Sequence, residues 1–145
     1  MKRILILIVS TVVLLLILFA IYIGNLNPQI KYEVSNGYSG YQSILILNRD
    51  GEYSLEITSH RGQPAKQFIG RLSLEEVKEI KESLILNVFV ILDEDLSEHS
   101  LLDNSTEKLS IRLGIFSRES GGYGVSNQRF RRIVNELELL IASHN

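Results

Sequence analysis

The sequence predicts an α+β protein in which an N-terminal transmembrane helix precedes a small antiparallel sheet with two helices packed on one face, in the order ββ(β)–α–β(β)–α. Three observations support this class. The first 23 residues are almost entirely apolar, several later segments alternate apolar and polar residues, and two further segments repeat apolar residues at helical spacing. The chain has 145 residues, which is long enough for one domain beyond the apolar segment.

The N-terminal segment predicts a membrane anchor. Residues 4–23 contain no charged residue, Gly or Pro, and a helix of this length spans roughly 30 Å, the thickness of a bilayer's hydrocarbon core. The run is longer than that of a signal peptide and lacks an A-x-A cleavage pattern, so we expect residues 1–23 to remain as an anchor that contacts the bilayer through residues 4–23. Lys2 and Arg3 precede it, which predicts a single-pass membrane protein with a cytoplasmic N-terminus.

Residues 24–29 form a short predicted linker, and residues 30–145 form the predicted extracytoplasmic α+β domain. The unbroken apolar run Ile44–Leu47 favours burial on both faces of the sheet, while glycine-punctuated turns separate the first strands. Loops are expected over 93–106 and 117–122. Alternation of apolar and polar residues predicts strands near residues 30–34, 41–47 and 52–59, a short strand at 68–69, and further strands near 107–116 and 123–125.

Two amphipathic helices are predicted in this domain. Ser73 and Glu76 fit a capping box at the start of the first helix. Asn127 is suited to cap the second, whose apolar residues form one stripe that we expect to seal the sheet. That stripe consists of Phe130, Ile133, Val134, Leu137, Leu140 and Ile141.

Composition excludes several classes of function. Residues 24–145 carry 13 Lys and Arg against 17 Asp and Glu, a net charge of −4, so nucleic acid is not an expected partner. The chain has no cysteine, which removes disulfides, thiolate chemistry and Cys-based zinc sites. We therefore expect no cofactor and no metal.

Candidate site residues are few, and we expect no catalytic residue. The acidic segment 93–100 offers oxygen ligands for Ca²⁺, but it lacks EF-hand spacing, so a solvated loop is favoured. His99, Ser100 and Asp103 are residue types of a hydrolytic triad without a nucleophile elbow. Three arginines lie near the start of the last helix. They form either a solvated helix face or an interaction surface for anionic lipid headgroups or an acidic partner. They are Arg129, Arg131 and Arg132.

Turn and cap motifs resemble those of small bacterial domains with a G-G-[FY]-x-G-like turn, a hairpin ending near D-G and a G-x-L-S-x-E-E helix start. The matching residues are Gly37, Tyr38 and Gly40, then Asp50 and Gly51, then Gly70, Leu72, Ser73, Glu75 and Glu76. In outline the arrangement is similar to the emfourin-type inhibitors of thermolysin-like metalloproteases. The resemblance covers residues 30–142 and implies a similar fold and a protease-inhibitor-like function. Asn36 stands where a second glycine is expected.

Together these features predict a membrane-anchored, non-enzymatic protein-interaction module, such as an accessory subunit or assembly factor with a membrane-proximal protein partner. A protease-inhibitor-like binding domain is the first alternative. A small hydrolase with an unrecognised site is the second. A deep pocket with convergent polar groups would favour the hydrolase, and an apolar surface patch would favour the interaction module.

Overall fold

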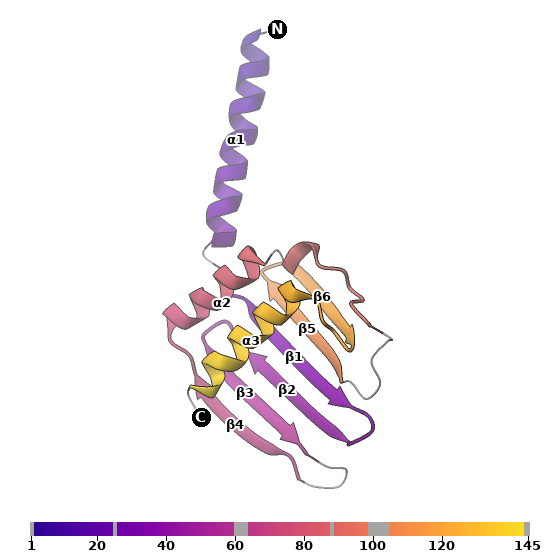
Figure 1. Ribbon diagram of the computed structural model, residues 1–145. Helices are drawn as coiled ribbons and strands as arrows, with labels where there is room; N and C mark the ends of the chain where they lie inside the picture. The colour runs from indigo at the N-terminus through magenta and orange to yellow at the C-terminus, as the bar shows by residue number, and fades with distance from the viewer. Residues whose placement is uncertain (1, 25, 60–63, 88, 99–104, 144–145) are drawn as a thin grey trace.

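The computed structural model describes residues 2–24, 26–59, 64–87, 89–98 and 105–143. Six strands form one antiparallel sheet in the order β4-β3-β2-β1-β5-β6. Helices α2 and α3 lie side by side across one face of this sheet, and α1 projects from its end (Figure 1). The elements are α1 (Lys2–Gly24), β1 (Gln29–Asn36), β2 (Tyr41–Leu47), β3 (Glu52–Thr58), β4 (Lys66–Arg71), α2 (Leu74–Leu86), the 3₁₀ turn η1 (Phe89–Ile91), β5 (Thr106–Leu113), β6 (Phe116–Tyr123) and α3 (Gln128–Ala142).

Short turns with local hydrogen bonds connect the first strands. Between β1 and β2, the side-chain Oδ1 of Asn36 accepts hydrogen bonds from the backbone N–H groups of Tyr38 and Ser39, both at 3.0 Å. Gly51 closes the β2–β3 turn at a φ of 86°, a left-handed conformation that favours glycine. These turns confirm the hairpins that the sequence predicts.

The core lies between the sheet and the two covering helices. Both caps are present: Ser73 and Glu76 form the capping box of α2, and Asn127 accepts hydrogen bonds at the start of α3. The apolar stripe of α3 faces the sheet, where Phe130 and Leu137 are at most 1% exposed. The structure therefore confirms the predicted sealing role of the last helix.

None of the described helices lies on the opposite face of the sheet (Figure 1). Leu45 and Leu47 point into the core, whereas Ile44 and Ile46 are only half-buried because they lie on the uncovered face. The prediction that this run is buried on both faces is wrong. Antiparallel sheets commonly leave one face in contact with solvent, and a continuous apolar run does not reveal which side stays uncovered.

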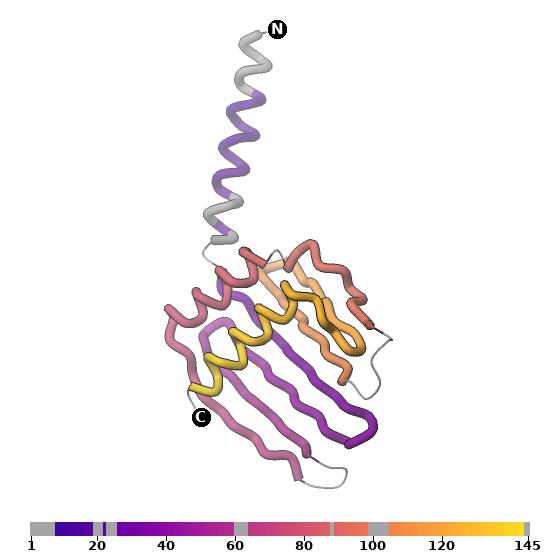
Figure 2. Tube along the Cα trace, viewed as in Figure 1, coloured from indigo at the N-terminus to yellow at the C-terminus, as the bar shows by residue number. Residues whose placement is uncertain are grey.

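The C-terminal part of the sheet differs from the prediction. Residues 117–122, expected as a loop, belong to β6, and the reversal of the chain occurs at Gly114, with a φ of 60°. The acidic segment 94–98 runs along the outer edge of β6 (Figure 2). Its backbone bonds include Leu96 N–H to the Gly121 carbonyl at 2.7 Å and Glu98 N–H to the Tyr123 carbonyl at 2.7 Å. Part of the predicted solvated loop thus pairs with an edge strand.

The predicted transmembrane anchor requires correction. Within the part of the chain that the structure describes, no helix is long and apolar enough to cross a membrane. The single-pass transmembrane prediction is therefore wrong, while the predicted extracytoplasmic location stays a prediction.

Candidate functional site

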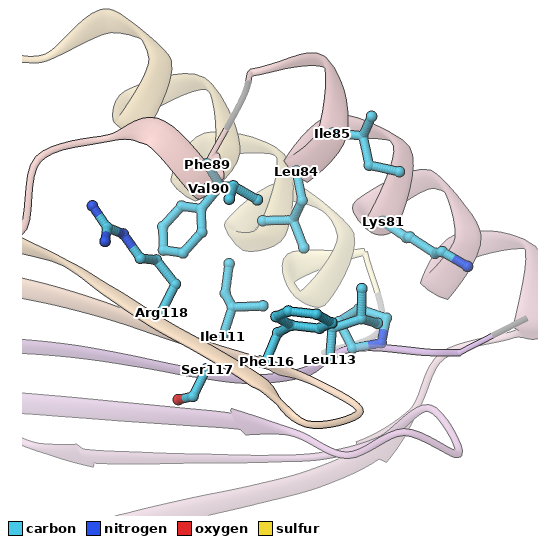
Figure 3. Close-up of a pocket in the computed structure, with 11 residues that line it drawn as sticks. Lys81, Leu84, Ile85, Phe89, Val90, Ile111, Leu113, Phe116, Ser117 and Arg118 are labelled. Carbon is cyan, nitrogen blue, oxygen red and sulfur yellow. The ribbon is translucent and has the colours of Figure 1, made fainter. Parts of the chain in front are cut away.

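A concave apolar pocket of about 390 Å³ lies between α2, η1 and the β5–β6 hairpin (Figure 3). We call it the end pocket. Its walls come from the second half of α2, from η1 and from the β5–β6 hairpin. A volume of this size lies within the range of roughly 300–1,000 Å³ that is typical of ligand pockets.

Local chain geometry explains why apolar side chains converge there. Helix α2 ends at Leu86, and η1 begins only three residues later, at Phe89. In η1 the side chain of Phe89 is buried, whereas Val90 is exposed beside the pocket. On the other wall, the tight turn at Gly114 pairs Leu113 with Phe116 across the hairpin. Both of these residues line the pocket.

The rim of the pocket exposes large apolar side chains. Val90 is 75% exposed, Ile85 is 63% exposed and Phe116 is 50% exposed, although all three line the pocket. Leu86, Ile91 and Ile115 next to them in sequence are exposed as well. Exposed apolar residues that gather around a concave surface mark an interaction site more strongly than scattered ones do.

Polar groups at the end pocket do not form a catalytic arrangement. Lys81 and Arg118 lie on opposite sides of it, and the Ser117 hydroxyl points away from the apolar side chains (Figure 3). The Arg118 guanidinium is held by the Leu92 carbonyl, with Nη2 donating at 2.6 Å, and lies 3.5 Å from a Glu94 carboxylate oxygen. Among the described residues that line the pocket there is no carboxylate, histidine or cysteine, and these residues therefore offer no acid–base pair of the kind that hydrolytic mechanisms use.

A second group of polar side chains is buried beneath α3. Glu107 is 7% exposed and accepts a hydrogen bond from the Tyr32 hydroxyl at 2.6 Å and one from Arg131 Nη1 at 2.9 Å. Arg131 Nη2 bonds the other carboxylate oxygen, and its Nε donates to the Val125 carbonyl at 2.7 Å. Arg131 therefore joins α3 to β5, while its side chain stays 36% exposed.

Burial of this group shifts two pKa values. Burial raises the pKa of the Tyr32 phenol above its usual range, and the hydrogen bond and negative charge of Glu107 raise it further. Burial also raises the pKa of the Glu138 carboxyl, with a further contribution from Glu107 that Arg131 opposes. The phenol thus stays protonated and acts as a hydrogen-bond donor, so the group is a structural link between sheet and helix.

The sequence analysis missed Glu107, although a signal for it exists. Glu107 has the same strand parity as Leu109 and Ile111, so alternation places it on the buried face of β5. A carboxylate on a buried face requires a partner of opposite charge or a set of donors. The arginines of the last helix offer such a partner, but the sequence does not reveal which one turns inward.

Arg129 and Arg132 behave differently from Arg131. Both are exposed, and they lie three residues apart on α3. Arg129 borders a shallow depression beside η1, whereas Arg132 lies near Glu79, Glu82 and Glu136 between α2 and α3. Arg129 and Arg132 are thus more accessible than Arg131, and the interaction surface of these three arginines stays a prediction.

The remaining sequence candidates do not form a described site. His99, Ser100 and Asp103 lie outside the residues that the structure describes, so the triad hypothesis stays untested. In the described ranges, no group of three or more His, Cys, Asp or Glu residues is placed to hold a metal ion. In the described part of the acidic segment, residues 93–98, the Asp95 carboxylate accepts a hydrogen bond from the Ser97 backbone N–H at 2.9 Å.

The turn that carries the family resemblance is well ordered by hydrogen bonds and presents Tyr38, which is 94% exposed. No protein-family model and no curated protein matches the chain. The similarity to emfourin-type inhibitors accordingly stays a prediction.

Proposed function

We propose that this protein is a non-enzymatic protein-interaction module whose end pocket receives an apolar side chain of a partner protein. The observation that carries the proposal is the combination of a concave apolar pocket with exposed apolar residues around it. Interface hot spots have this form, in which one large side chain fills a desolvated pocket and surrounding contacts exclude water.

A protein segment suits the pocket because the apolar surface extends beyond the cavity. Val90, Ile85 and Phe116 each expose at least half of their surface. Full burial of such a side chain contributes about 1.5–3 kcal/mol. A small ligand held inside the cavity would leave most of the rim uncovered, whereas a helix or strand with one anchoring side chain would cover both.

Photocrosslinking tests this function directly. A benzophenone amino acid placed at Val90 of the full chain, in cells that express it, should yield a discrete protein adduct. The same group at Glu56, an exposed position on the uncovered face of the sheet, should not. Phe116→Asp should abolish the Val90 adduct because it places a charge in the apolar pocket, whereas Leu139→Asp should leave it intact, because Leu139 is 72% exposed on α3.

Several results would contradict the proposal. They are the absence of any adduct at Val90, an adduct that persists in the Phe116→Asp variant, or a mass increase that corresponds to a lipid or metabolite instead of a protein. Urea unfolding of the Phe116→Asp and Leu139→Asp variants provides the control, since both must retain a cooperative transition near that of the wild type.

A second candidate function is that of a protease-inhibitor-like binding domain, which the exposure of Tyr38 on an ordered turn favours. Replacing Tyr38 with Ala removes the side chain without touching the core. If the turn inhibits a thermolysin-like metalloprotease, the wild type should slow peptide hydrolysis and Tyr38→Ala should not. An equal lack of inhibition by both proteins contradicts this candidate.

A further inference from the structure

We infer that the outer edge of β4 binds an extended segment of a partner protein that carries acidic residues at both ends of an apolar centre. The inference concerns a surface separate from the end pocket and does not depend on it. It rests on the difference between the two edges of the sheet, on the exposure of β4 and on the positions of its charges.

The two edge strands of the sheet differ in whether their outer backbone groups are paired. Along β6, residues 94–98 pair with the strand through backbone bonds at Gly121 and Tyr123, and an isolated parallel bridge joins Asp95 to Gly121. At the other end of the strand order, β4 pairs only with β3, and no strand lies on its outer side among the described residues (Figure 1). An uncovered edge presents backbone donors and acceptors to an added strand.

The side chains of β4 are accessible and partly apolar. Five of its six residues are exposed, with Gly70 intermediate. Ile69 is 70% exposed and Phe68 is 39% exposed, on successive positions that point to opposite faces of the sheet. An added strand with apolar residues opposite them would cover both.

Charge selects the partner. Lys66 and Arg71 lie at the two ends of β4. Because β4 contains these two cations and no acidic residue, two copies of β4 paired edge to edge would bring four cations together without a carboxylate between them. Like charges opposite each other destabilise strand pairs, and opposite charges stabilise them. A second copy is therefore disfavoured and an acidic strand is favoured.

The neighbouring carboxylates do not neutralise this edge. Arg71 lies 3.6 Å from Asp50 and 3.7 Å from Glu52, but all three side chains are more than half exposed. Such exposed, long ion pairs contribute little and exchange readily with a partner. The Arg71 guanidinium thus remains accessible to a carboxylate on an added strand.

The test uses the full chain and two synthetic peptides of matched length, one with the central sequence E-T-V-I-T-E and one with K-T-V-I-T-K. Peptide titrations followed by amide NMR shifts should show saturable binding of the acidic peptide, with the largest shifts and the largest gain in hydrogen-exchange protection in β4. The acidic peptide should bind about tenfold more tightly than the basic one. The double variant Lys66→Glu, Arg71→Glu should reverse that preference.

Matched controls separate this site from the end pocket. The Phe116→Asp variant must bind the acidic peptide as the wild type does, and a peptide with methylated backbone nitrogens must not bind. The inference is overturned if the shifts lie outside β3 and β4, if neither peptide binds, or if the charge reversal has no effect. It is also overturned if sedimentation shows a dimer of the full chain that Lys66→Glu alters.

Discussion

Glu107 is the side chain on which the buried polar contacts between β5 and α3 converge. In Glu107→Gln the charge is lost while the shape is retained, so the bonds from Arg131 and Tyr32 weaken and one donor is left facing another. Bonds to charged groups contribute about 1.5–3 kcal/mol, and we expect a loss of stability in that range. Urea unfolding of the full chain measures it.

Glu119→Gln is the matched control for this prediction. Glu119 also carries a carboxylate and pairs with a cation, Lys108, at 2.8 Å, but both side chains are about half exposed. We expect a much smaller shift of the urea midpoint than for Glu107→Gln. Equal shifts in the two variants would show that burial of the Glu107 group does not contribute to stability.

Because the pKa of the buried Tyr32 phenol is raised, we expect the stability of the protein to fall at alkaline pH. This pKa is raised in the folded protein, so the unfolded chain loses the phenolic proton first, near pH ~10. The stabilising contribution is therefore complete below that pH and declines as the pH rises above it. The advantage of the wild type over Tyr32→Phe should shrink between about pH 9 and 11 in urea titrations. A difference that is constant with pH would contradict the assignment.

At the scale of elements, the close contact between β5 and β6 depends on Gly121. A Cβ at this position would lie 2.1 Å from the Glu107 carbonyl oxygen, which is backbone and has little room to move. We expect Gly121→Ala to cost about 1–3 kcal/mol through this clash. In Gly37→Ala the added Cβ would meet nothing within 4 Å, so thermal unfolding should show little loss. Similar melting temperatures for the two variants would refute the close approach.

Helix α3 gives a second prediction at this scale. Leu137 is 1% exposed and Leu139 is 72% exposed, two residues apart on the same helix. Leu137→Ala should cost about 2–5 kcal/mol because it leaves a cavity in the core. Leu139→Ala removes the same atoms from the surface and should change stability by less than about 0.5 kcal/mol. An unmoved denaturation midpoint for Leu137→Ala would mean that the helix does not seal the core.

Helix caps and hairpins were predictable because short, local sequence patterns determine them. Ser73 and Glu76 form the expected capping box, and glycine-containing turns join the first strands as predicted, with Gly51 at a φ of 86°. The strand at 116–123 was not predictable, because Gly121 is unfavourable in an isolated strand and is required only by the close approach of the β5 backbone. Tertiary contact decided the conformation there.

The end pocket was beyond prediction for a related reason. It combines α2, η1 and the β5–β6 hairpin, which are separate in sequence and meet only in the folded sheet. In the sequence, apolar residues such as Val90 and Phe116 cannot be told from core residues. Only the folded structure shows that they lie at the border of the end pocket. The inward turn of Arg131 likewise depends on the position of Glu107 across the fold.

At the scale of the whole molecule, the strand order divides the sheet into two locally connected parts. Short turns join β1 to β2 and β2 to β3, a longer segment leads on to β4, and a tight turn joins β5 to β6. The ladder between β1 and β5 is different, since it pairs residues far apart in the chain, such as Ser35 with Thr106. This ladder also carries the buried contact between Tyr32 and Glu107.

That ladder has a consequence for the kinetics of folding. Closing a long loop costs entropy before its contacts form, so we expect the docking of the β5–β6 hairpin onto β1 to limit the folding rate. Ile111→Val, in the ladder, should slow refolding in stopped-flow measurements, whereas Ile57→Val, near the β4 edge, should mainly accelerate unfolding. The reverse pattern would place the nucleus in the β1–β4 part. Until the hairpin docks, β1 is itself an unpaired edge, and the folding chain has a transient site for aggregation that the native protein does not.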